Sequence, residues 1–527
     1  MNIIEHNSMK KNWRITPVKF ALCYPNAYRV GMSCLATHLL YEILNMRNDV
    51  LCERFFYDSK LPILSIESKK PLNLFNIIGF SMQYELDYIH SIKMLLKSGI
   101  PPLSDDRKEG DPIVCFGGPS VTSNPEPLAP FADVIFIGEV EDTLNQFIDT
   151  FLERRSRKRF EILDGFSKIP GVYVPKLNNR VKRVWVNNLD KVPHAIRQII
   201  PKVSSKSSFH PVLGKSFLLE VSRGCGWGCR FCLEGYNYLP MRFRSFEKLI
   251  KILDDGLKYT PTNNIVIIGS AALSHPNLKE LLNYLHMHGY FFSMPSLRLD
   301  LVDEDLLMLL KKGGQRTPVF APETSSERLL NIINKRFELD RLFDTIRIVK
   351  NVGFKNVKLY FILGLPGETI DDVQSILDIV CKVADLGFMG LRSVRLSFSF
   401  FVPKANTPFQ WFGMENKKSL KDKINLIRMK LKGDKRFEVR FPSIRESMIQ
   451  AFISRSGREI SPILLYVAKI DGNLSSWYVA EKHFKFSIEE IVTKTLDSSV
   501  RLPWEFFDIG YDRLILFKEF NKAISEL

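Results

Sequence analysis

The sequence lacks several features that would place the protein in a familiar class. It has no run of roughly eighteen apolar residues, so no membrane-spanning helix is expected. The first residues lack the charged and then apolar segments of a secretory signal, so we expect a cytoplasmic protein. Cysteine is scarce, at 8 of 527 residues, which disfavours a disulfide-stapled fold. Neither an internal repeat nor a low-complexity tract occurs, which argues against a solenoid.

The composition is that of a globular protein with more than one domain. Hydrophobic residues make up 45% of the chain and charged residues 25%, and the length allows about two to four domains. The net charge is 74 − 58 = +16, and residues 151–210 carry 14 basic against 4 acidic side chains, or +10. Such a stretch can bind nucleic-acid phosphates, but no interleaved aromatics or nucleic-acid motif accompany it. Solvated helix ends therefore explain it more simply.

Three of the cysteines are crowded into one glycine-rich loop. Cys225, Cys229 and Cys232 follow the spacing C-x3-C-x2-C, with the aromatic Phe231 just before the last of them. Three thiolates are one fewer than the four ligands that close a structural zinc or iron–sulfur site. A [4Fe–4S] cluster held by three cysteines leaves one iron open for a substrate or cosubstrate. A zinc site completed by a histidine is the alternative, and it is disfavoured because no histidine lies at the usual short offset from the loop.

The first 150 residues alternate short apolar strands with helices. This rhythm predicts a doubly wound parallel sheet, a fold that binds ligands at the carboxyl ends of its strands. Gly117, Gly118 and Gly138 fall at two of these ends. The expected strands are 18–25, 77–81, 112–119 and 133–139, and the expected helices are 34–45, 88–97 and a further helix from 141.

Residues 151–210 form a basic connector. Two β-like runs, 171–175 and 181–186, flank Asn178 and Asn179, a pattern that predicts a hairpin.

The alternation of strands and helices resumes in residues 211–410. Six strands are too few for a closed eight-unit barrel, so we expect a partial, crescent-like (β/α)6 barrel. The cysteine loop follows the first of these strands, at the carboxyl end where barrels carry their active sites. Residues 411–527 are predicted to form a C-terminal α/β extension. The expected strands are 217–221, 264–269, 290–296, 319–321, 358–363 and 394–400, with helices at 245–257, 277–287 and 303–312.

Taken together, these motifs resemble the radical S-adenosylmethionine (SAM) superfamily. The cysteine loop matches the family's signature, and Phe231 matches the aromatic residue that lies near the SAM adenine in that family. The resemblance spans residues 215–410. The segments that resemble the family's strand ends are 295–300, 321–328 and 361–369, and 402–409 is similar to the closing segment of its methylthiotransferase-like branches.

The resemblance implies a radical SAM enzyme. A [4Fe–4S] cluster on the three cysteines would cleave SAM reductively to methionine and a 5′-deoxyadenosyl radical, with the electron supplied by an external donor such as ferredoxin or flavodoxin. Gly269-Ser270-Ala271 stands where the family usually has Gly-Gly-Glu, so the SAM amino group would contact backbone carbonyls or Ser270. The residues expected to contact SAM are Phe231, Gly269, Ser270, Ser296, Arg298, Glu323, Ile362 and Leu365.

Individual roles follow from side-chain chemistry. Arg298 could pair with the SAM carboxylate, and Glu323 could accept hydrogen bonds from the ribose or the amino group. An ordinary ion pair at a strand end is the alternative for each. Ile362 and Leu365 could pack against the adenine, or simply belong to the barrel core.

The N-terminal part is similar to the cobalamin-binding domain of another branch of the superfamily, through residues 116–122 and 136–141. The motif D-x-H-x-x-G, which supplies a cobalt ligand in many cobalamin proteins, is absent. Retention and loss of cobalamin are both consistent with the sequence. The remaining cysteines of this part match no compact ligand motif, so buried thiols are favoured over a second cluster: Cys23, Cys34, Cys52 and Cys115.

Three functions remain open on sequence alone. The first is a SAM-radical enzyme acting on an unidentified substrate, with cobalamin-dependent methyl transfer as one form. The second is an RNA-modifying methyltransferase or methylthiotransferase, suggested by the basic connector but unsupported by an RNA-binding motif. The third is a non-enzymatic iron–sulfur carrier or sensor, which a fourth nearby cysteine would have favoured.

Overall fold

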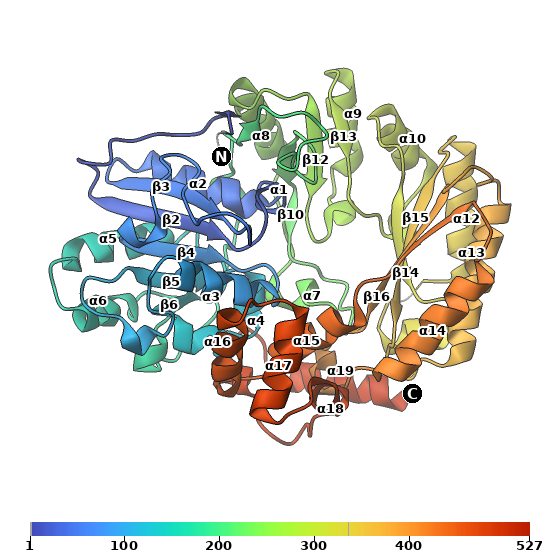
Figure 1. Ribbon diagram of the computed structural model, residues 1–527. Helices are drawn as coiled ribbons and strands as arrows, with labels where there is room; N and C mark the ends of the chain where they lie inside the picture. The colour runs from blue at the N-terminus through green and yellow to red at the C-terminus, as the bar shows by residue number, and fades with distance from the viewer. Residues whose placement is uncertain (1–2, 336) are drawn as a thin grey trace.

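Two strand layers and a set of C-terminal helices make up the structure. The computed structural model describes residues 3–335 and 337–527. Figure 1 shows the N-terminal sheet on one side, a curved layer of strands on the other, and the C-terminal helices below both.

The N-terminal sheet has six strands in the order β3-β2-β4-β5-β6-β7. The first five are parallel, and β7 joins the edge antiparallel to β6. The strands are β3 (Val50–Phe56), β2 (Val18–Tyr24), β4 (Ile77–Ser81), β5 (Ile113–Gly117), β6 (Val134–Phe136) and β7 (Val172–Tyr173).

Helices cover both faces of this sheet, which confirms the doubly wound fold. On one face, α2, α5 and α6 pack on side chains such as Phe20 and Cys115. On the other face, α3 packs on side chains such as Phe80 and Phe116. The helices of this part are α1 (Tyr28–Gly31), α2 (Leu35–Met46), α3 (Asp87–Lys97), α4 (Pro119–Ser123), α5 (Leu144–Arg154) and α6 (Arg159–Phe166).

The second strand layer is an open crescent of parallel strands. One half has the order β13-β12-β9 and the other β14-β15-β16-β17, and only an isolated bridge between Leu297 and Phe320 joins them in the described chain. The seventh strand, β17, was not predicted. It lies within residues 411–527, the predicted C-terminal extension, and pairs with β16. The strands are β9 (Phe217–Glu220), β12 (Asn264–Ile268), β13 (Phe291–Ser293), β14 (Val319–Glu323), β15 (Val357–Leu363), β16 (Val394–Phe400) and β17 (Phe437–Arg440).

Amphipathic helices cover the outer side of the crescent because their apolar faces pack on alternate strand residues. A capping box at Thr369 and Asp372 fixes the start of one of them, α13. These helices are α8 (Phe246–Tyr259), α9 (Leu278–Met287), α10 (Glu304–Lys312), α12 (Leu339–Asn351), α13 (Ile370–Asp385) and α14 (Lys417–Lys430). The short α11 (Glu327–Ile332) belongs instead to a separate cluster with the last helix of the chain.

The C-terminal helices connect the two layers. Helix α16 packs against α3 of the N-terminal part, and α19 packs against α11 of the crescent. These helices are α15 (Ile444–Ser454), α16 (Ser461–Lys469), α17 (Leu474–Phe484), α18 (Ile488–Thr493) and α19 (Arg513–Ser525). Within the described residues, none of the helices combines the length and apolar character needed to cross a membrane.

The predicted hairpin in the connector is wrong. Its first run forms β7 and pairs with β6, while Val184 of the second run bridges Gly138 and Lys182 bridges Asp508. The turn fails because the Asn179 side chain bonds the backbone of Val172 and Val174 instead of reversing the chain. Pairing of the two runs with distant segments therefore outweighs the local preference of the asparagines for a hairpin turn.

Part of the connector's positive charge is used internally. The Arg159 guanidinium donates to Asp133 over 2.6 Å, and that of Arg183 donates to the carbonyls of Asn237 and Ile509. Both side chains are buried. These two arginines are therefore not part of an exposed basic face for RNA.

Two buried histidines fasten the end of the connector to both layers. His38 Nδ1 accepts from the Ile199 amide and His194 Nε2 from the Glu220 amide, each over 3.1 Å. Burial lowers the pKa of both imidazoles to about 4. Each ring is therefore neutral at pH 7, as an accepting nitrogen requires.

We predict that acid destabilises the fold through these histidines. An unfolded imidazole, with its ordinary pKa of 6.5, takes up a proton that the folded one resists until about pH 4. Stability is therefore present above pH 6.5 and is lost as the pH falls toward 4, by up to roughly 3 kcal/mol per ring. The His194→Gln variant keeps an acceptor without titrating, so its melting temperature should fall less than the wild type's between pH 7 and pH 5. The exposed His288→Gln is the control, and equal losses in all three proteins would contradict the prediction.

Candidate functional site

The cysteine loop leaves the carboxyl end of β9 and is closed at its base by a small ladder. Strand β10 (Ser222–Arg223) pairs antiparallel with β11 (Arg242–Phe243), and α7 (Glu234–Asn237) lies between them. Gly224 has φ +83°, and a Cβ there would lie 2.3 Å from the Tyr238 carbonyl oxygen. Only glycine fits this close approach, so Gly224 is required by the shape of the loop. The predicted position of the loop at the first strand of the crescent is confirmed.

The three cysteines are free thiols in half-buried positions. Burial raises the pKa of each, that of Cys232 to about 12. Backbone N–H groups oppose this effect, from Trp227 toward Cys225 and from Glu234 and Gly235 toward Cys232. Such donors favour the thiolate, which is the form that binds metal.

No three histidine, cysteine or acidic side chains of the described residues are grouped closely enough to hold one metal ion. The thiols are nevertheless near one another, because the charge of Cys225 raises the pKa of Cys229 and the charge of Cys229 raises the pKa of Cys232. In a cubane each cysteine binds a different iron, so its sulfurs stand further apart than the donors of a single ion. The three thiols of the loop are the candidate ligands of such a cluster.

Two basic side chains act on the loop, Arg298 from the segment after β13 and Lys335 from the segment after α11. The Arg298 guanidinium lies 3.9 Å from the centre of the Trp227 ring and pairs with Asp300 over 2.8 Å. Lys335 pairs with Glu323 over 2.7 Å. Both cations help to lower the pKa of Cys225 and Cys229 against the opposing effect of burial. Arg298 and Glu323 thus have protein partners, and their predicted contacts with SAM stay predictions.

Glu323 stands out by its backbone. Its φ of +69° lies in the left-handed region, which a non-glycine residue adopts only at a cost of about 1–3 kcal/mol. A bulge in the pairing of β14 with β15 accompanies it. The strain turns the carboxylate of Glu323 toward Lys335 at the mouth of the crescent.

The remaining predicted SAM residues fall into two groups. Phe231, Ile362 and Leu365 belong to one hydrophobic cluster under the loop. Gly269 and Ser270 lie at the end of β12, while Ser296 is exposed in the segment after β13. A Cβ on Gly269 would lie 2.3 Å from Ser222 Oγ, so the glycine permits the packing of β12 on β10.

Ser270 has a partner that the sequence did not reveal. Its hydroxyl donates to Glu234 over 2.6 Å, and burial raises the pKa of that carboxyl. Glu234 begins α7, two residues after Cys232. A carboxylate therefore stands beside the position where the family's usual glutamate is missing, but it comes from the cysteine loop. Only the fold could bring the two residues together.

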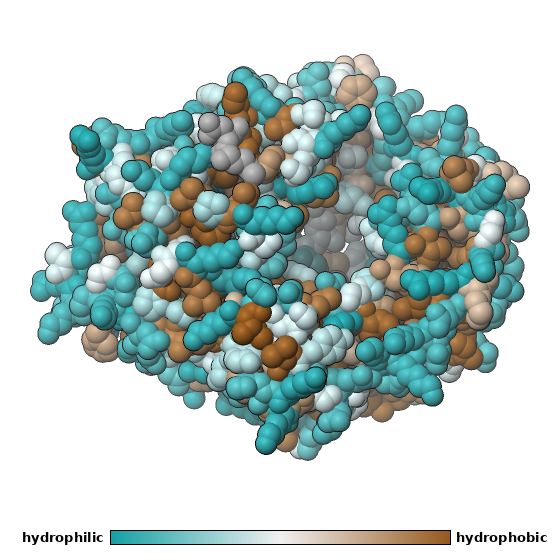
Figure 2. Space-filling model, viewed as in Figure 1, coloured by the Kyte–Doolittle hydropathy of each residue, from teal (hydrophilic) through white to brown (hydrophobic). Residues whose placement is uncertain are grey.

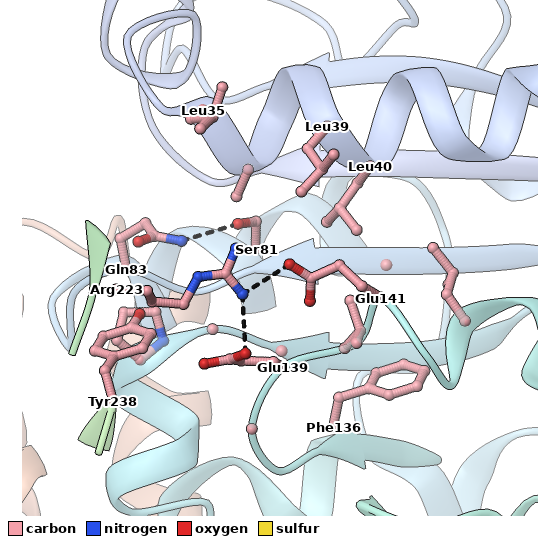
Figure 3. Close-up of a pocket in the computed structure, with 18 of the residues that line it drawn as sticks. Leu35, Leu39, Leu40, Ser81, Gln83, Phe136, Glu139, Glu141, Arg223 and Tyr238 are labelled. Carbon is pink, nitrogen blue, oxygen red and sulfur yellow. Dashed lines mark hydrogen bonds and ion pairs between the residues drawn. The ribbon is translucent and has the colours of Figure 1, made fainter. Parts of the chain in front are cut away.

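A cavity of about 480 Å³ lies where the two strand layers meet. Figure 3 shows Leu35, Leu39 and Leu40 of α2 along one side, facing Phe136 and the ends of the N-terminal strands. The barrel contributes Ser222, Ile268, Gly269, Ser270 and Glu234 to the wall. Gly117, Gly118 and Gly138, predicted to lie at a binding edge, also line it. The cavity therefore joins the carboxyl edge of the N-terminal sheet to the cysteine loop.

An ion-pair network crosses this junction. Arg223, whose side chain is 12% exposed, pairs with Glu220 over 2.9 Å, Glu139 over 3.0 Å and Glu141 over 2.7 Å. Figure 3 shows its guanidinium between the carboxylates of Glu139 and Glu141. Arg242 pairs with Glu139 and Arg244 with Glu220, so three cations balance three anions.

The network also sets the charge state of its members. Burial alone raises the pKa of the Glu220 carboxyl, but Arg223 and Arg244 outweigh burial and bring that pKa to about 2. Neither Arg223 nor the pair Glu139 and Glu141 was predicted as functional. Their sequence signals are that each lies at or within two residues of the end of a predicted strand, and that Glu139 and Glu141 fall in the segment 136–141 that resembles a cobalamin-binding domain.

Loss of Arg223 should loosen the two layers. Removing one partner of a buried network costs about 3–5 kcal/mol, because the remaining carboxylates keep their desolvation penalty. Arg223→Met should therefore lower the melting temperature of the chain by several degrees, as measured by differential scanning calorimetry. Arg347→Met, which breaks an exposed pair with Asp344, serves as the matched control and should change nothing measurable. An Arg223→Met variant that melts like the wild type would refute the structural role.

Comparison with known proteins identifies the family. The profile described as "Radical SAM proteins, N-terminal" matches residues 36–175, and "Radical SAM superfamily" matches residues 219–380. An uncharacterised protein of Methanocaldococcus jannaschii is 31% identical over 450 residues, covering 85% of this chain and 90% of that protein.

Two solved structures share the overall fold. One is a radical SAM methyltransferase, TsrM, from Kitasatospora setae with tryptophan and a SAM analogue bound, with a TM-score of 0.50 and 13% identity over 89% of this chain and 99% of that one. The other is OxsB, a cobalamin-dependent SAM radical enzyme with aqua-cobalamin bound, with a TM-score of 0.50 and 14% identity over 97% and 80% of the two chains. At these identities the likeness establishes the fold, a crescent preceded by a doubly wound domain. Together with the two matched profiles and the cysteine loop, it shows that the chain belongs to the radical SAM superfamily of enzymes.

Proposed function

We propose that the protein is a cobalamin-dependent radical SAM methyltransferase. Cys225, Cys229 and Cys232 would hold a [4Fe–4S] cluster, and SAM would bind at the carboxyl edge of the crescent. When bound, the cluster supplies the electron that cleaves SAM to methionine and a 5′-deoxyadenosyl radical. An external one-electron donor such as ferredoxin or flavodoxin would reduce the cluster. The domain division at residues 1–150, 151–210, 211–410 and 411–527 belongs to this proposal. Two strands pair across it: β7 of the connector with β6, and β17 of the C-terminal extension with β16.

The single observation that carries the proposal is the cavity between the layers. It opens at the carboxyl edge of the N-terminal sheet, and Glu234 on its wall is two residues from Cys232. A ligand in the cavity would therefore lie directly beside the cysteine loop. The matched fold in OxsB, a protein solved with cobalamin, supports a corrinoid as that ligand.

The residues of the cavity suit such a ligand. Leu35, Leu39 and Phe136 offer an apolar wall for a flat ring, while Ser81 and Gln83 offer hydrogen-bonding groups at the sheet edge. No histidine is among the described residues that line it. Bound cobalamin would supply a methyl group for transfer, and the protein would hold it without a histidine ligand.

The chain's own residues would organise this chemistry. The glycine-bounded loop holds the thiols, Arg298 covers Trp227 at its edge, and Arg223 locks the loop's base to the sheet that carries the cavity. Closing the site between two layers limits the access of water, which protects a reactive radical.

The proposal is tested by anaerobic reconstitution with iron, sulfide and hydroxocobalamin. We expect about four irons and about one cobalt per chain, and formation of 5′-deoxyadenosine when SAM and dithionite are added. Iron without deoxyadenosine would contradict the radical step. Iron and deoxyadenosine without cobalt would contradict the cobalamin part alone.

A further inference from the structure

The inner face of the crescent's second half is polar. Along β15 and β16, side chains such as Leu359 and Leu396 alternate with exposed or half-buried ones, and the buried set packs under the outer helices. Because side chains alternate along a strand, the other set faces the hollow inside the crescent. Figure 1 shows β14, β15 and β16 on this inner side, with α12, α13 and α14 outside. The inward residues on β15, β16 and β17 are Lys358, Tyr360, Arg395, Ser397, Ser399, Glu438 and Arg440.

Strand register places the basic members side by side. Lys358 is the direct neighbour of Arg395, which in turn neighbours Glu438, and Ser397 neighbours Arg440. Residues at the same register of parallel strands point to the same face. Three cations and one carboxylate therefore share one surface, for a balance of +2.

The one carboxylate leaves Lys358 without an anionic partner. Glu438 accepts a hydrogen bond from Arg440 and lies 3.6 Å from Arg395. Lys358 Nζ instead donates to the Tyr360 hydroxyl over 2.8 Å, and no carboxylate of the described chain pairs with it. Since that hydroxyl accepts from Lys358, its own proton is free to be donated. An ammonium and a hydroxyl donor thus point together into the hollow.

The other half of the crescent is different. The inward positions of β9 and β12 include the apolar Leu218, Val266 and Ile268, and the inward charge at the end of β9, Glu220, is already paired with Arg223 and Arg244. In contrast, the side chain of Arg395 is 45% exposed and that of Arg440 is 74% exposed. Figure 2 shows the molecule hollowed at this place, between the N-terminal layer and the second half of the crescent. The cations therefore line an open space that a ligand can enter.

The distance from Lys358 to the cysteine loop determines how long a ligand bound at both places must be. Lys358 precedes Ile362 by four residues on β15, which at the usual strand rise is ~13 Å. Ile362 belongs to the cluster beneath the loop that also contains Leu365. A ligand anchored at Lys358 would therefore reach the loop only if it were elongated by about this length.

We propose that Lys358 and Arg395, with the Tyr360 hydroxyl, bind an anionic oxygen group, either carboxylate or phosphate, at the far end of an elongated substrate. The reacting end would then lie beside the cysteine loop. Two adjacent cations and one hydroxyl donor match the charge and hydrogen-bonding needs of such a group. The assignment as substrate rests on the proposed function, whereas the binding of the anion does not.

The test uses the full-length chain and two simple probes, inorganic phosphate and succinate. Binding is measured by isothermal titration calorimetry at fixed ionic strength, without iron, SAM or cobalamin. We expect at least one probe to bind, and Lys358→Met or Arg395→Gln to weaken that binding about tenfold, the loss of one charged hydrogen bond. Phosphate binding alone would identify a phosphate-bearing substrate, and succinate binding alone a carboxylate-bearing one.

Two further variants separate a specific loss from a general one. Lys421→Met removes the same charge from the exposed surface of α14, outside the crescent, and should bind like the wild type. Tyr360→Phe keeps the ring and should weaken binding by a smaller factor. Failure of both probes to bind, or equal weakening by Lys421→Met, would overturn the proposal. Because the assay needs no cofactor, its failure is distinguishable from a failure to form deoxyadenosine.

Discussion

Replacing Cys229 with serine should reduce the iron content of the reconstituted protein from about four to less than one per chain. A cluster held by three thiolates has no spare protein ligand, and a serine hydroxyl binds iron far more weakly than a thiolate does. Formation of 5′-deoxyadenosine should fall below detection. Iron analysis, the visible absorption spectrum and product chromatography measure these three outcomes.

The matched control for this change is Cys381→Ser. Cys381 is a free cysteine on α13, on the outer side of the crescent and outside the cysteine loop. Its iron content and deoxyadenosine formation should equal those of the wild type. A Cys229→Ser protein that keeps its iron and its activity would remove the basis for the cluster assignment.

The second large effect is expected from filling the cavity between the layers. Ala36 lies on α2 and lines the cavity beside Leu35 and Leu39. An indole at this position would occupy space that the proposed corrinoid needs, and overpacking of this kind costs about 1–3 kcal/mol even when neighbours adjust. Ala36→Trp should therefore reduce cobalt binding about tenfold or more while the iron content stays unchanged.

A matched tryptophan separates this effect from damage to the helix. Met46 ends the same helix and is 60% exposed, so Met46→Trp adds the same ring outside the cavity. That variant should bind cobalt like the wild type. Equal cobalt binding by Ala36→Trp and the wild type would show that the corrinoid does not use this cavity.

Together these two changes test the halves of the site separately. The cysteine loop and the cavity share a wall at Glu234 and Ser270, but their ligands would be held by different residues. Iron should therefore be lost in the cysteine variant and cobalt in the cavity variant. Because the Arg223 network joins the two layers, Arg223→Met should lower the melting temperature even when neither the cluster nor cobalamin is bound.

The sequence by itself determined the features that depend on local order. Glycines and cysteines at fixed spacing determined the loop. The repeat of apolar strands and helices determined most of both strand layers, but β3 and β17 were not predicted and β7 was assigned to a hairpin. The helices over 35–46 and 87–97 and the first six strands of the crescent were predicted within a few residues, because their periodicity reflects burial on one face. The local asparagine signal failed at 178–179, where β6 competed for the same strand.

Only the tertiary structure decided how distant residues meet. Arg223 contacts Glu139 across more than eighty positions of sequence (223 − 139 = 84), and Ser270, just after β12, contacts Glu234 of α7. The fold likewise sets the partners of Lys335 and Arg298, which pair with Glu323 at the end of β14 and with Trp227 of the cysteine loop. No pattern in the sequence encodes such pairs, because a charged residue at a strand end carries no mark of which other strand end will face it.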